Sequence, residues 1–364
     1  MVKPVNVGIV GCGAISAAYT TTIARLAGLR LTAVADLDAA RARATAEANG
    51  TRALSVAELL ADPDVDIVLN LTIPAAHADV ALAAIAAGKD VYGEKPLATT
   101  KAEALQVLQA ADTAGARLGC APDTVLGTGV QTARWYVDNG LIGRPVAATA
   151  IMNHPGHERW HPNPDFYYTP GGGPLFDMGP YYITALITLL GPVSKVIGAA
   201  SRTRSERTIV TGPRAGTTVP VTTDSHVTGI LIHDSGALST LVMSFDSAAT
   251  RAPNIELHGE QATLHLPDPN HFDGEIHAHP VGGTWTSLPT RAGYQDAARG
   301  YGLADLTTTP PTQLPRTSAA LALHVLDIME SLLTSTTTGQ ATALTTTCDR
   351  PPPVPLGPLE PRTE

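Results

Sequence analysis

Residues 5–16 read Val-Asn-Val-Gly-Ile-Val-Gly-Cys-Gly-Ala-Ile-Ser, and this segment is the strongest indication of the fold class. A short apolar run is followed at once by two closely spaced glycines and then by an alanine-rich segment with helical character. An apolar strand, a glycine turn and a helix in this order are typical of the first unit of a dinucleotide-binding domain.

The glycine turn follows the G-x-G-x-x-G pattern, with Gly11 and Gly13 in the first two places and Ser16 in the third. Gly11 permits the tight turn, and Gly13 lets the backbone approach a pyrophosphate. Ala14 and Ile15 open the helix, whose unpaired N–H groups favour an anion. Because serine is small, Ser16 still allows close packing of helix and strand. We therefore expect a pyrophosphate to bind at this turn.

A carboxylate follows the turn at the distance that nucleotide recognition requires. Asp36 ends the second expected strand, about 20 residues beyond Ser16, where a carboxylate bonds the adenosine ribose hydroxyls. It would repel a 2′-phosphate, and the next residue, Leu37, brings no cation. Arg41 and Arg43 are expected to face solvent. The sequence therefore favours NAD(H) over NADP(H).

Residues 1–122 alternate short apolar runs with alanine-rich segments. The expected strands are Val5–Val10, Leu29–Ala35, Ile67–Thr72, Asp90–Tyr92 and Arg117–Cys120, and the expected helices are Ala14–Leu26, Asp38–Asn49, Ala75–Ala87 and Thr99–Ala114. Strands that alternate with helices of this length predict a parallel sheet built from βαβ units. The fold class is therefore α/β, opening with a doubly wound Rossmann domain.

Residues 123–345 have a different rhythm, which predicts an α+β domain with a large, mostly antiparallel sheet. The expected helices are Val125–Asp138, Met178–Leu190 and Arg316–Leu333, and the expected strands are Pro145–Met152, Val193–Ala200, His226–His233, Ala237–Phe245, Asn254–Gly259 and Ala262–Leu266. Residues 346–364 contain several prolines and are expected to be extended. A sheet of this kind must bury its second face, so we expect a homo-oligomer, a dimer or tetramer, through it.

Composition excludes several classes of protein. The net charge of −9 offers no basic face for nucleic acid. The three cysteines form no CxxC pair, which favours a reducing compartment and predicts no metal site. A strand begins within a few residues of Met1, and no apolar run reaches the ~18–20 residues of a membrane helix. We expect a cytoplasmic protein without a membrane partner.

Further motifs follow in order along the chain. They are Leu71-Thr72-Ile73-Pro74 with His77, Gly93-Glu94-Lys95-Pro96, and Gly171-Gly172-Gly173 leading into Asp177-Met178-Gly179-Pro180-Tyr181. Together with Gly11, Gly13 and Asp36, they make the chain resemble the glucose–fructose oxidoreductase, inositol dehydrogenase and rhizopine catabolism family (Gfo/Idh/MocA). The resemblance extends from residue 5 to about residue 335.

The resemblance implies an NAD(H)-dependent oxidoreductase acting on CH–OH groups, with Lys95 beside the nicotinamide and the substrate. It makes a cis peptide bond at Lys95–Pro96 an expectation, since family members often have one there. It also places further residues in the dinucleotide site: Thr72, Ile73, Pro74, His77 and Glu94.

Asp177 and Tyr181 are four residues apart at the start of an apolar helix, so they share one face. Capping of the helix is an alternative role for Asp177. Most family members carry histidine in place of Tyr181, and a subgroup similar to dimeric dihydrodiol dehydrogenase carries tyrosine. Because the ordinary pKa is ~10 for tyrosine and ~6.5 for histidine, a tyrosine base needs a nearby cation. We expect Lys95 and Tyr181 to share proton transfer while Asp177 orients the substrate or Lys95.

The loop from Asn153 to Tyr168 mixes histidines with aromatic rings, which suits a polyol. His154, Trp160 and Tyr167 are the expected substrate contacts, and Asp123, after a strand end, is a fourth. The predicted substrate is a sugar, a cyclitol or a related cyclic alcohol. Three alternatives stay open: a dihydrodiol-type dehydrogenase, an enzyme that retains its NAD between two substrates, and a non-catalytic dinucleotide-binding regulator of the same fold.

Overall fold

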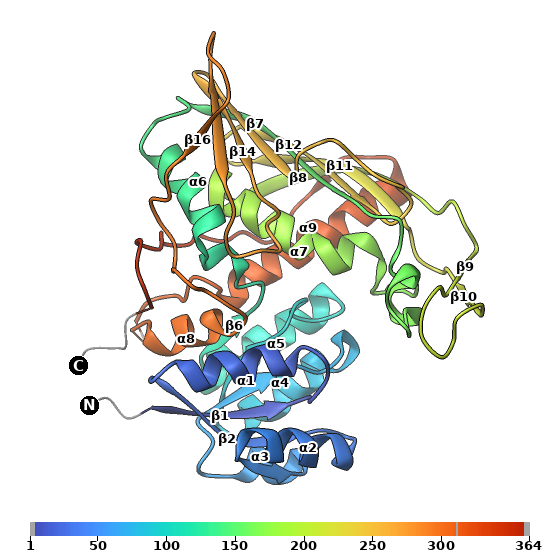
Figure 1. The fold of residues 1–364 in the computed structure, drawn as a ribbon, viewed down its shortest axis with the longest axis vertical. Helices are drawn as coiled ribbons and strands as arrows, with labels where there is room; N and C mark the ends of the chain where they lie inside the picture. The colour runs from blue at the N-terminus through green and yellow to red at the C-terminus, as the bar shows by residue number, and fades with distance from the viewer. Residues whose placement is uncertain (1–3, 311, 360–364) are drawn as a thin grey trace. The chain divides into compact units, whose positions relative to one another are not determined.

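The computed structural model describes residues 4–310 and 312–359 (Figure 1). The chain divides into two compact units, each with its own sheet. Among the described residues, unit 1 comprises residues 4–127, 294–310, 312–323 and 354–359, and unit 2 comprises residues 128–293 and 324–353. The expected fold class, a parallel doubly wound domain joined to a mostly antiparallel one, is confirmed.

Unit 1 contains a six-stranded sheet in which every pair of neighbouring strands is parallel. The strand order is β3-β2-β1-β4-β5-β6, which is the order of a Rossmann sheet. The strands are β1 (Val5–Val10), β2 (Leu29–Ala35), β3 (Arg52–Leu54), β4 (Ile67–Asn70), β5 (Asp90–Gly93) and β6 (Leu118–Cys120). Because β1 and β4 are neighbours and the order reverses there, their carboxyl ends form the point where such sheets bind ligands.

Helices connect these strands in the blue part of Figure 1. They are α1 (Ser16–Arg25), α2 (Ala39–Asn49), α3 (Val56–Ala61), α4 (His77–Ala86) and α5 (Lys101–Ala114). Strand β3 and helix α3 were not predicted, since a three-residue strand and a six-residue helix carry too little periodicity. Helix α3 nevertheless has a clear start, because Ser55 and Glu58 form a capping box.

The C-terminal part of the chain returns to unit 1, so the expected uninterrupted domain of residues 123–345 is not what the structure has. Helix α8 (Tyr301–Thr308) was not predicted, and its Leu303 and Leu306 complete the core of unit 1 beside Val7 and Ile9. The first boundary lies near residue 127. Sequence spacing cannot show that a later segment packs back on an earlier core.

Unit 2 contains a nine-stranded sheet of order β16-β15-β14-β13-β7-β12-β11-β8-β17. Only β7 and β12 pair in parallel within it; the other neighbours are antiparallel. Its strands are β7 (Pro145–Asn153), β8 (Val193–Ser201), β11 (His226–His233), β12 (Leu238–Ser244), β13 (Ile255–Gly259), β14 (Ala262–Leu266), β15 (Ile276–Pro280), β16 (Thr286–Leu288) and β17 (Thr342–Ala343). A separate hairpin joins β9 (Glu206–Thr208) to β10 (Thr218–Pro220).

Helices α6 (Thr128–Asp138), α7 (Gly173–Leu190) and α9 (Ala319–Thr338) lie together on one face of this sheet (Figure 1). Helix α7 packs on β7, β11 and β12, and α6 packs on β14 and β15. A Cβ on Gly198 would lie 2.5 Å from the Leu332 carbonyl oxygen, so glycine permits the close approach of α9 to β8. The opposite face includes the exposed side chains of Ile197, Ile230 and Leu238.

Helix α9 contradicts the expectation that no apolar segment is long enough for a membrane helix. Its 20 residues are long and apolar enough to cross a membrane by length and composition alone, whereas no such run was expected. Of its apolar window, 67% is buried within the fold, including Leu326, Ile328 and Met329. This burial is what the core helix of a globular protein shows.

The tail is extended as far as residue 359, and its last five residues lie outside the described part. Its first half is bonded to unit 2, where the Arg350 guanidinium donates to the Thr188 carbonyl at 2.7 Å and pairs with Asp138 at 2.6 Å. Its second half buries Val354 in unit 1. Residues 346–353 therefore belong to unit 2, and residues 354–359 belong to unit 1.

Candidate functional site

The glycine turn of unit 1 adopts a conformation that only glycine allows. Gly11 has φ +101°, and a Cβ there would lie 2.6 Å from the carbonyl oxygen of Leu71. A Cβ on Gly13 would have no atom within 4 Å, so this position opens to space. Gly11 therefore allows the ends of β1 and β4 to lie in close contact, and Gly13 leaves room for a ligand.

Asp36, at the end of β2, is tied to the same turn. Its Oδ2 accepts a 2.7 Å hydrogen bond from the backbone N–H of Cys12, and its Oδ1 accepts one of 2.8 Å from Asp38. Arg41 lies 3.6 Å from the Asp36 carboxylate and 3.8 Å from that of Asp38. Arg41 faces solvent, as expected, with a side chain that is 53% exposed, and it is also the outer partner of this carboxylate.

Thr72, two residues beyond β4, is held by a residue that no sequence pattern indicated. Asn70 is buried, and its side-chain oxygen accepts from the Thr72 hydroxyl at 2.6 Å and from the Thr72 N–H at 3.3 Å. The Asn70 amide donates to the His77 carbonyl at 3.0 Å. Asn70 was overlooked because a polar residue ending a buried strand gives no periodic signal.

His77 does not present its ring on the surface of the expected dinucleotide site. It is 2% exposed, with Nδ1 at 2.6 Å from the Pro96 carbonyl oxygen and Nε2 at 3.0 Å from that of Thr72. Burial lowers the pKa of His77, and a ring nitrogen that carries a proton donates to the carbonyl beside it. The buried ring of His77 therefore links the loop after β4 to the Glu-Lys-Pro segment.

Lys95 follows β5 in a segment fixed on both sides. The Lys95–Pro96 peptide bond is cis, as expected. Glu94 accepts from the Tyr19 hydroxyl of α1 at 2.8 Å and from the Lys95 N–H at 3.0 Å. The Cys120 thiol donates to the Glu94 carbonyl at 3.6 Å. Glu94 thus fixes the backbone of Lys95, and Tyr19 and Cys120 are supporting residues that the sequence did not reveal.

These strand ends fit a dinucleotide. Three large apolar side chains are exposed around them: Leu37 after β2 (99%), Ile73 after β4 (70%) and Ile15 beside the glycine turn (37%). Exposed apolar side chains next to the open position at Gly13 offer a surface for a flat base and space for phosphates. Pro74 begins a short 3-10 turn (Pro74–Ala76) that leads into α4. Ala14 lies beside Gly13 at the opening of α1.

In unit 2, Asp177 and Tyr181 lie inside helix α7, which begins at Gly173. Asp177 is therefore a full turn into the helix, and the alternative of helix capping is wrong. Its Oδ2 lies 2.8 Å from Nε2 of His157, and their side chains are only 15% and 10% exposed. Tyr181, one turn further on, is buried. The partner of Asp177 was missed because it comes from a loop 20 residues earlier.

The loop around His157 is lined with aromatic rings. Ring centroids lie 4.2 Å from His157 for Tyr167, 5.1 Å for Trp160 and 5.2 Å for His154. Trp160 is 53% exposed, and its indole N–H donates to His157 Nδ1 at 3.1 Å. Burial lowers the pKa of His154, which favours the neutral ring. The three expected substrate contacts of this loop thus gather around one buried histidine.

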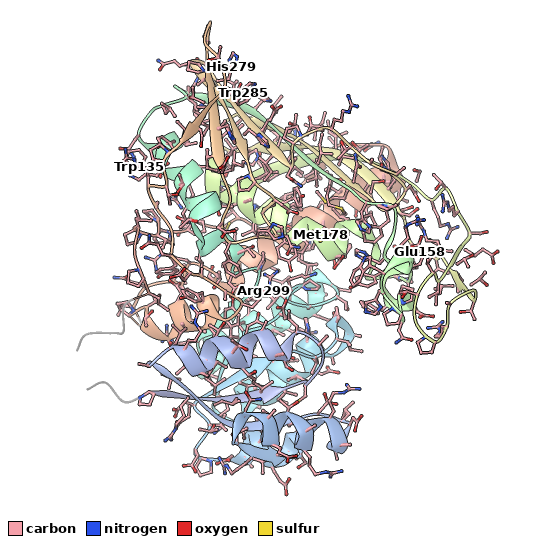
Figure 2. All side chains as sticks on the ribbon, viewed as in Figure 1. Trp135, Glu158, Met178, His279, Trp285 and Arg299 are labelled. Carbon is pink, nitrogen blue, oxygen red and sulfur yellow. The ribbon has the colours of Figure 1, made fainter. Side chains whose placement is uncertain are left out.

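A buried charged network anchors this loop. The Arg207 guanidinium donates to Glu158 at 3.0 Å and pairs with Asp246, and Tyr168 donates to the same Glu158 carboxylate. Glu158 lies near the β9–β10 hairpin that carries Arg207 (Figure 2). At Gly156, with φ +108°, a Cβ would fall 2.2 Å from a Glu158 oxygen. The network therefore fixes the backbone on both sides of His157.

Asp123 is not the substrate contact that we expected. It is fully buried, and its Oδ2 accepts from the backbone N–H groups of Gly300 at 2.7 Å and Gly302 at 3.1 Å. Its Oδ1 lies 3.6 Å from the Arg299 guanidinium. Asp123 thus attaches the returning segment before α8 to the β6 end of the sheet. A strand-end carboxylate can serve either role, and sequence does not distinguish them.

Among the residues that the structure describes, no group of three or more histidine, cysteine or acidic side chains is arranged to hold a metal ion. The polar groups of unit 1 instead converge on a glycine turn at the switch point of a Rossmann sheet. These features define a dinucleotide-binding α/β protein with a second, mostly antiparallel unit.

Each of the two units contains a segment that matches a known protein-domain family. The NAD-binding Rossmann fold of the GFO/IDH/MocA oxidoreductase family matches residues 5–121, and the family's C-terminal domain matches residues 130–265. The chain therefore belongs to this family, as the motifs had indicated.

Curated relatives share part of the sequence. The 1,5-anhydro-D-fructose reductase of Ensifer adhaerens is 38% identical over 125 residues, which cover 33% of this chain and 36% of that protein. An inositol 2-dehydrogenase of Agrobacterium fabrum is 35% identical over 176 residues, which cover 46% and 49%. In both comparisons the chain matches less than half the length of the curated relative.

Solved structures share the fold over nearly the whole chain. An NAD-binding oxidoreductase from Klebsiella pneumoniae aligns with a TM-score of 0.81 at 22% identity, covering 94% of this chain and 100% of that one. A levoglucosan dehydrogenase in complex with NADH and L-sorbose aligns with a TM-score of 0.79 at 20% identity, covering 95% and 100%.

Asp123→Ala should lower stability and leave substrate affinity unchanged. It removes the acceptor of two buried N–H groups and leaves the Arg299 charge without its carboxylate, at a cost of about 3 kcal/mol. Urea unfolding measures this loss, and Asp123→Asn, which keeps an acceptor oxygen, should lose less. A raised KM with unchanged unfolding would show that Asp123 contacts substrate after all.

Proposed function

We propose that this protein is an NAD(H)-dependent oxidoreductase that transfers hydride between the nicotinamide and a CH–OH carbon of a sugar, cyclitol or related cyclic alcohol. The observation that carries the proposal is family membership across both units, together with Lys95, Asp177 and Tyr181 at the motif positions. A non-catalytic regulator has no need for this set of ionisable residues.

Each residue of the set has a distinct role in the proposal. A bound nicotinamide supplies the chemistry of accepting or returning a hydride. Tyr181 Oη or Lys95 Nζ takes the substrate hydroxyl proton. The Asp177 carboxylate accepts a hydrogen bond that orients the reacting hydroxyl.

The loop of unit 2 supports a polyol as substrate. Trp160 and Tyr167 provide ring faces that stack on a sugar ring, and His154 provides a neutral imidazole for a hydroxyl. The names of several relatives refer to substrates of this kind, including inositol 2-dehydrogenase and D-xylose dehydrogenase.

The three cysteines, none of them in a disulfide, support a reducing compartment such as the cytoplasm.

Lys95→Met tests the reaction. Turnover should fall by about 10²-fold or more, because the variant loses the proton-transfer cation, while dinucleotide affinity changes little. Steady-state formation of NADH and calorimetric NAD⁺ binding measure the two effects. Lys101→Met, at the start of α5, is the matched control and should keep normal turnover. Near-normal kcat in Lys95→Met would contradict the assignment.

Asp36 leads us to propose NAD(H) as the cofactor in preference to NADP(H). Its carboxylate is held at the turn by Cys12 and Asp38, where it would repel a 2′-phosphate. Arg41 at 3.6 Å partly offsets that repulsion, so the preference rests on the carboxylate itself.

Asp36→Ser should narrow the preference for NAD⁺ over NADP⁺ by about tenfold or more, since the repulsion disappears and Arg41 becomes available to a phosphate. Parallel kcat/KM measurements with both cofactors give the ratio. Asp38→Asn removes a neighbouring charge but keeps a helix N-cap, and its ratio should stay at the wild-type value. An unchanged ratio in Asp36→Ser would exclude this account of cofactor choice.

We further propose that the open face of the nine-stranded sheet joins copies of the chain into a homo-oligomer. Ile197 and Ile230 are cross-strand partners on this face, 43% and 39% exposed, and Leu238 on β12 is 48% exposed. Exposed apolar side chains on neighbouring strands favour association. A second copy would cover them with the same surface, as two-fold symmetry allows.

Ile230→Lys should convert this oligomer to single chains, because it places a charge in the centre of the face. Light scattering should give a multiple of 37.7 kDa for the wild type and 37.7 kDa for the variant. Leu105→Lys, an exposed position on α5, should leave the mass unchanged. A wild-type mass of one chain would contradict the interface.

A further inference from the structure

We propose that His157 is a positioning residue for the reaction, acting through Asp177, and that Trp160, His157 and Asp177 form a directed chain of hydrogen bonds from the loop surface to helix α7. The proposal rests on the function proposed above and adds the residue that fixes Asp177. Neither the family motifs nor the sequence patterns singled out His157.

The direction of the chain follows from which groups can donate. The indole N–H of Trp160 can only donate, so Nδ1 of His157, at 3.1 Å, must accept. A neutral imidazole with an unprotonated Nδ1 carries its proton on Nε2. That N–H then donates to Asp177 Oδ2 at 2.8 Å. The tautomer of His157 is therefore fixed by Trp160 and matched to a carboxylate.

The ring itself has little freedom to move. Tyr167 and Phe245 pack against it with centroids at 4.2 Å and 4.4 Å, and the backbone N–H of His157 donates to the Tyr168 hydroxyl at 2.9 Å. The neighbouring Glu158 is bonded to Arg207, whose guanidinium is almost fully buried. His157 is thus held in place before any substrate binds.

The exposure of the three side chains indicates how this hydrogen-bond chain would affect catalysis. Trp160 is 53% exposed, whereas the Asp177 and His157 side chains are 15% and 10% exposed. A sugar ring that stacks on Trp160 therefore contacts the exposed end of this hydrogen-bond chain. At the buried end of the chain, His157 orients Asp177. Because an orienting group acts most in the transition state, its loss should lower kcat more than it raises KM.

The experiment compares two substitutions at one position. His157→Phe keeps a ring among Tyr167 and Phe245 but removes both hydrogen bonds, so kcat should fall by about 10–100-fold with a smaller change in KM. His157→Gln retains a donor for Asp177 and should recover most of that loss. His161→Phe is the matched control, since His161 lies in the same loop and bonds the Asn163 N–H.

A readout that needs no activity accompanies the kinetics. Long-range ¹H–¹⁵N spectra of the wild type should show the His157 proton on Nε2, and Trp160→Phe should lose that fixed tautomer. If no polyol reduces NAD⁺ in the wild type, the proposed function fails, and the spectra still test the hydrogen-bond chain. A wild type that turns over while His157→Phe keeps its kcat, or a proton on Nδ1, would overturn the inference.

Discussion

Gly11 packs against the Leu71 carbonyl so closely that a single Cβ would lie 2.6 Å from its oxygen. Around this contact the Gly11 N–H donates to the Ala35 carbonyl at 2.8 Å, and the Leu71 N–H donates to the Val10 carbonyl at 2.8 Å. The ends of β1, β2 and β4 are thereby joined at the reversal of strand order. The glycine turn can face a ligand because its backbone groups on the other side are already bonded.

Beyond this turn, buried polar side chains fix the residues that we propose to contact the ligands. Asn70 holds Thr72, His77 spans the Thr72 and Pro96 carbonyls, and Glu94 holds the Lys95 backbone. Unit 2 follows the same principle, with Glu158 and Arg207 behind the loop that carries His157. Preorganisation of this kind lowers the entropic cost of ordering the site during binding and catalysis.

The sequence predicted the elements that obey a simple period. Strands β1, β2 and β11 were predicted with the bounds observed, because their apolar runs are bounded by clear turn signals. Strand β15 was missed, since its five residues offer only Ile276 and Ala278 as inward apolar positions and end in a proline. The placement of α8 in unit 1 could not be predicted either, because it depends on long-range packing and the buried carboxylate of Asp123.

The candidate site divides in the same way. Motif spacing predicted Gly11, Asp36, Lys95 and Asp177 as site residues, because their proposed chemistry requires fixed positions along the chain. Their supporting partners, such as Tyr19 and Asn70, lie far away in sequence or carry no pattern of their own. Motifs therefore predict which groups react, while only the folded chain reveals what orients them.

Isotope transfer shows whether this protein moves a hydride between a polyol carbon and nicotinamide. Sugars and cyclitols deuterated at their CH–OH carbons would be incubated with the protein and NAD⁺, and the dinucleotide analysed by mass spectrometry and NMR. We expect at least one of these polyols to give NADH carrying deuterium at C4 of the nicotinamide. Tight NAD⁺ binding without deuterium transfer from any of them would contradict the account and favour a nucleotide-binding regulator.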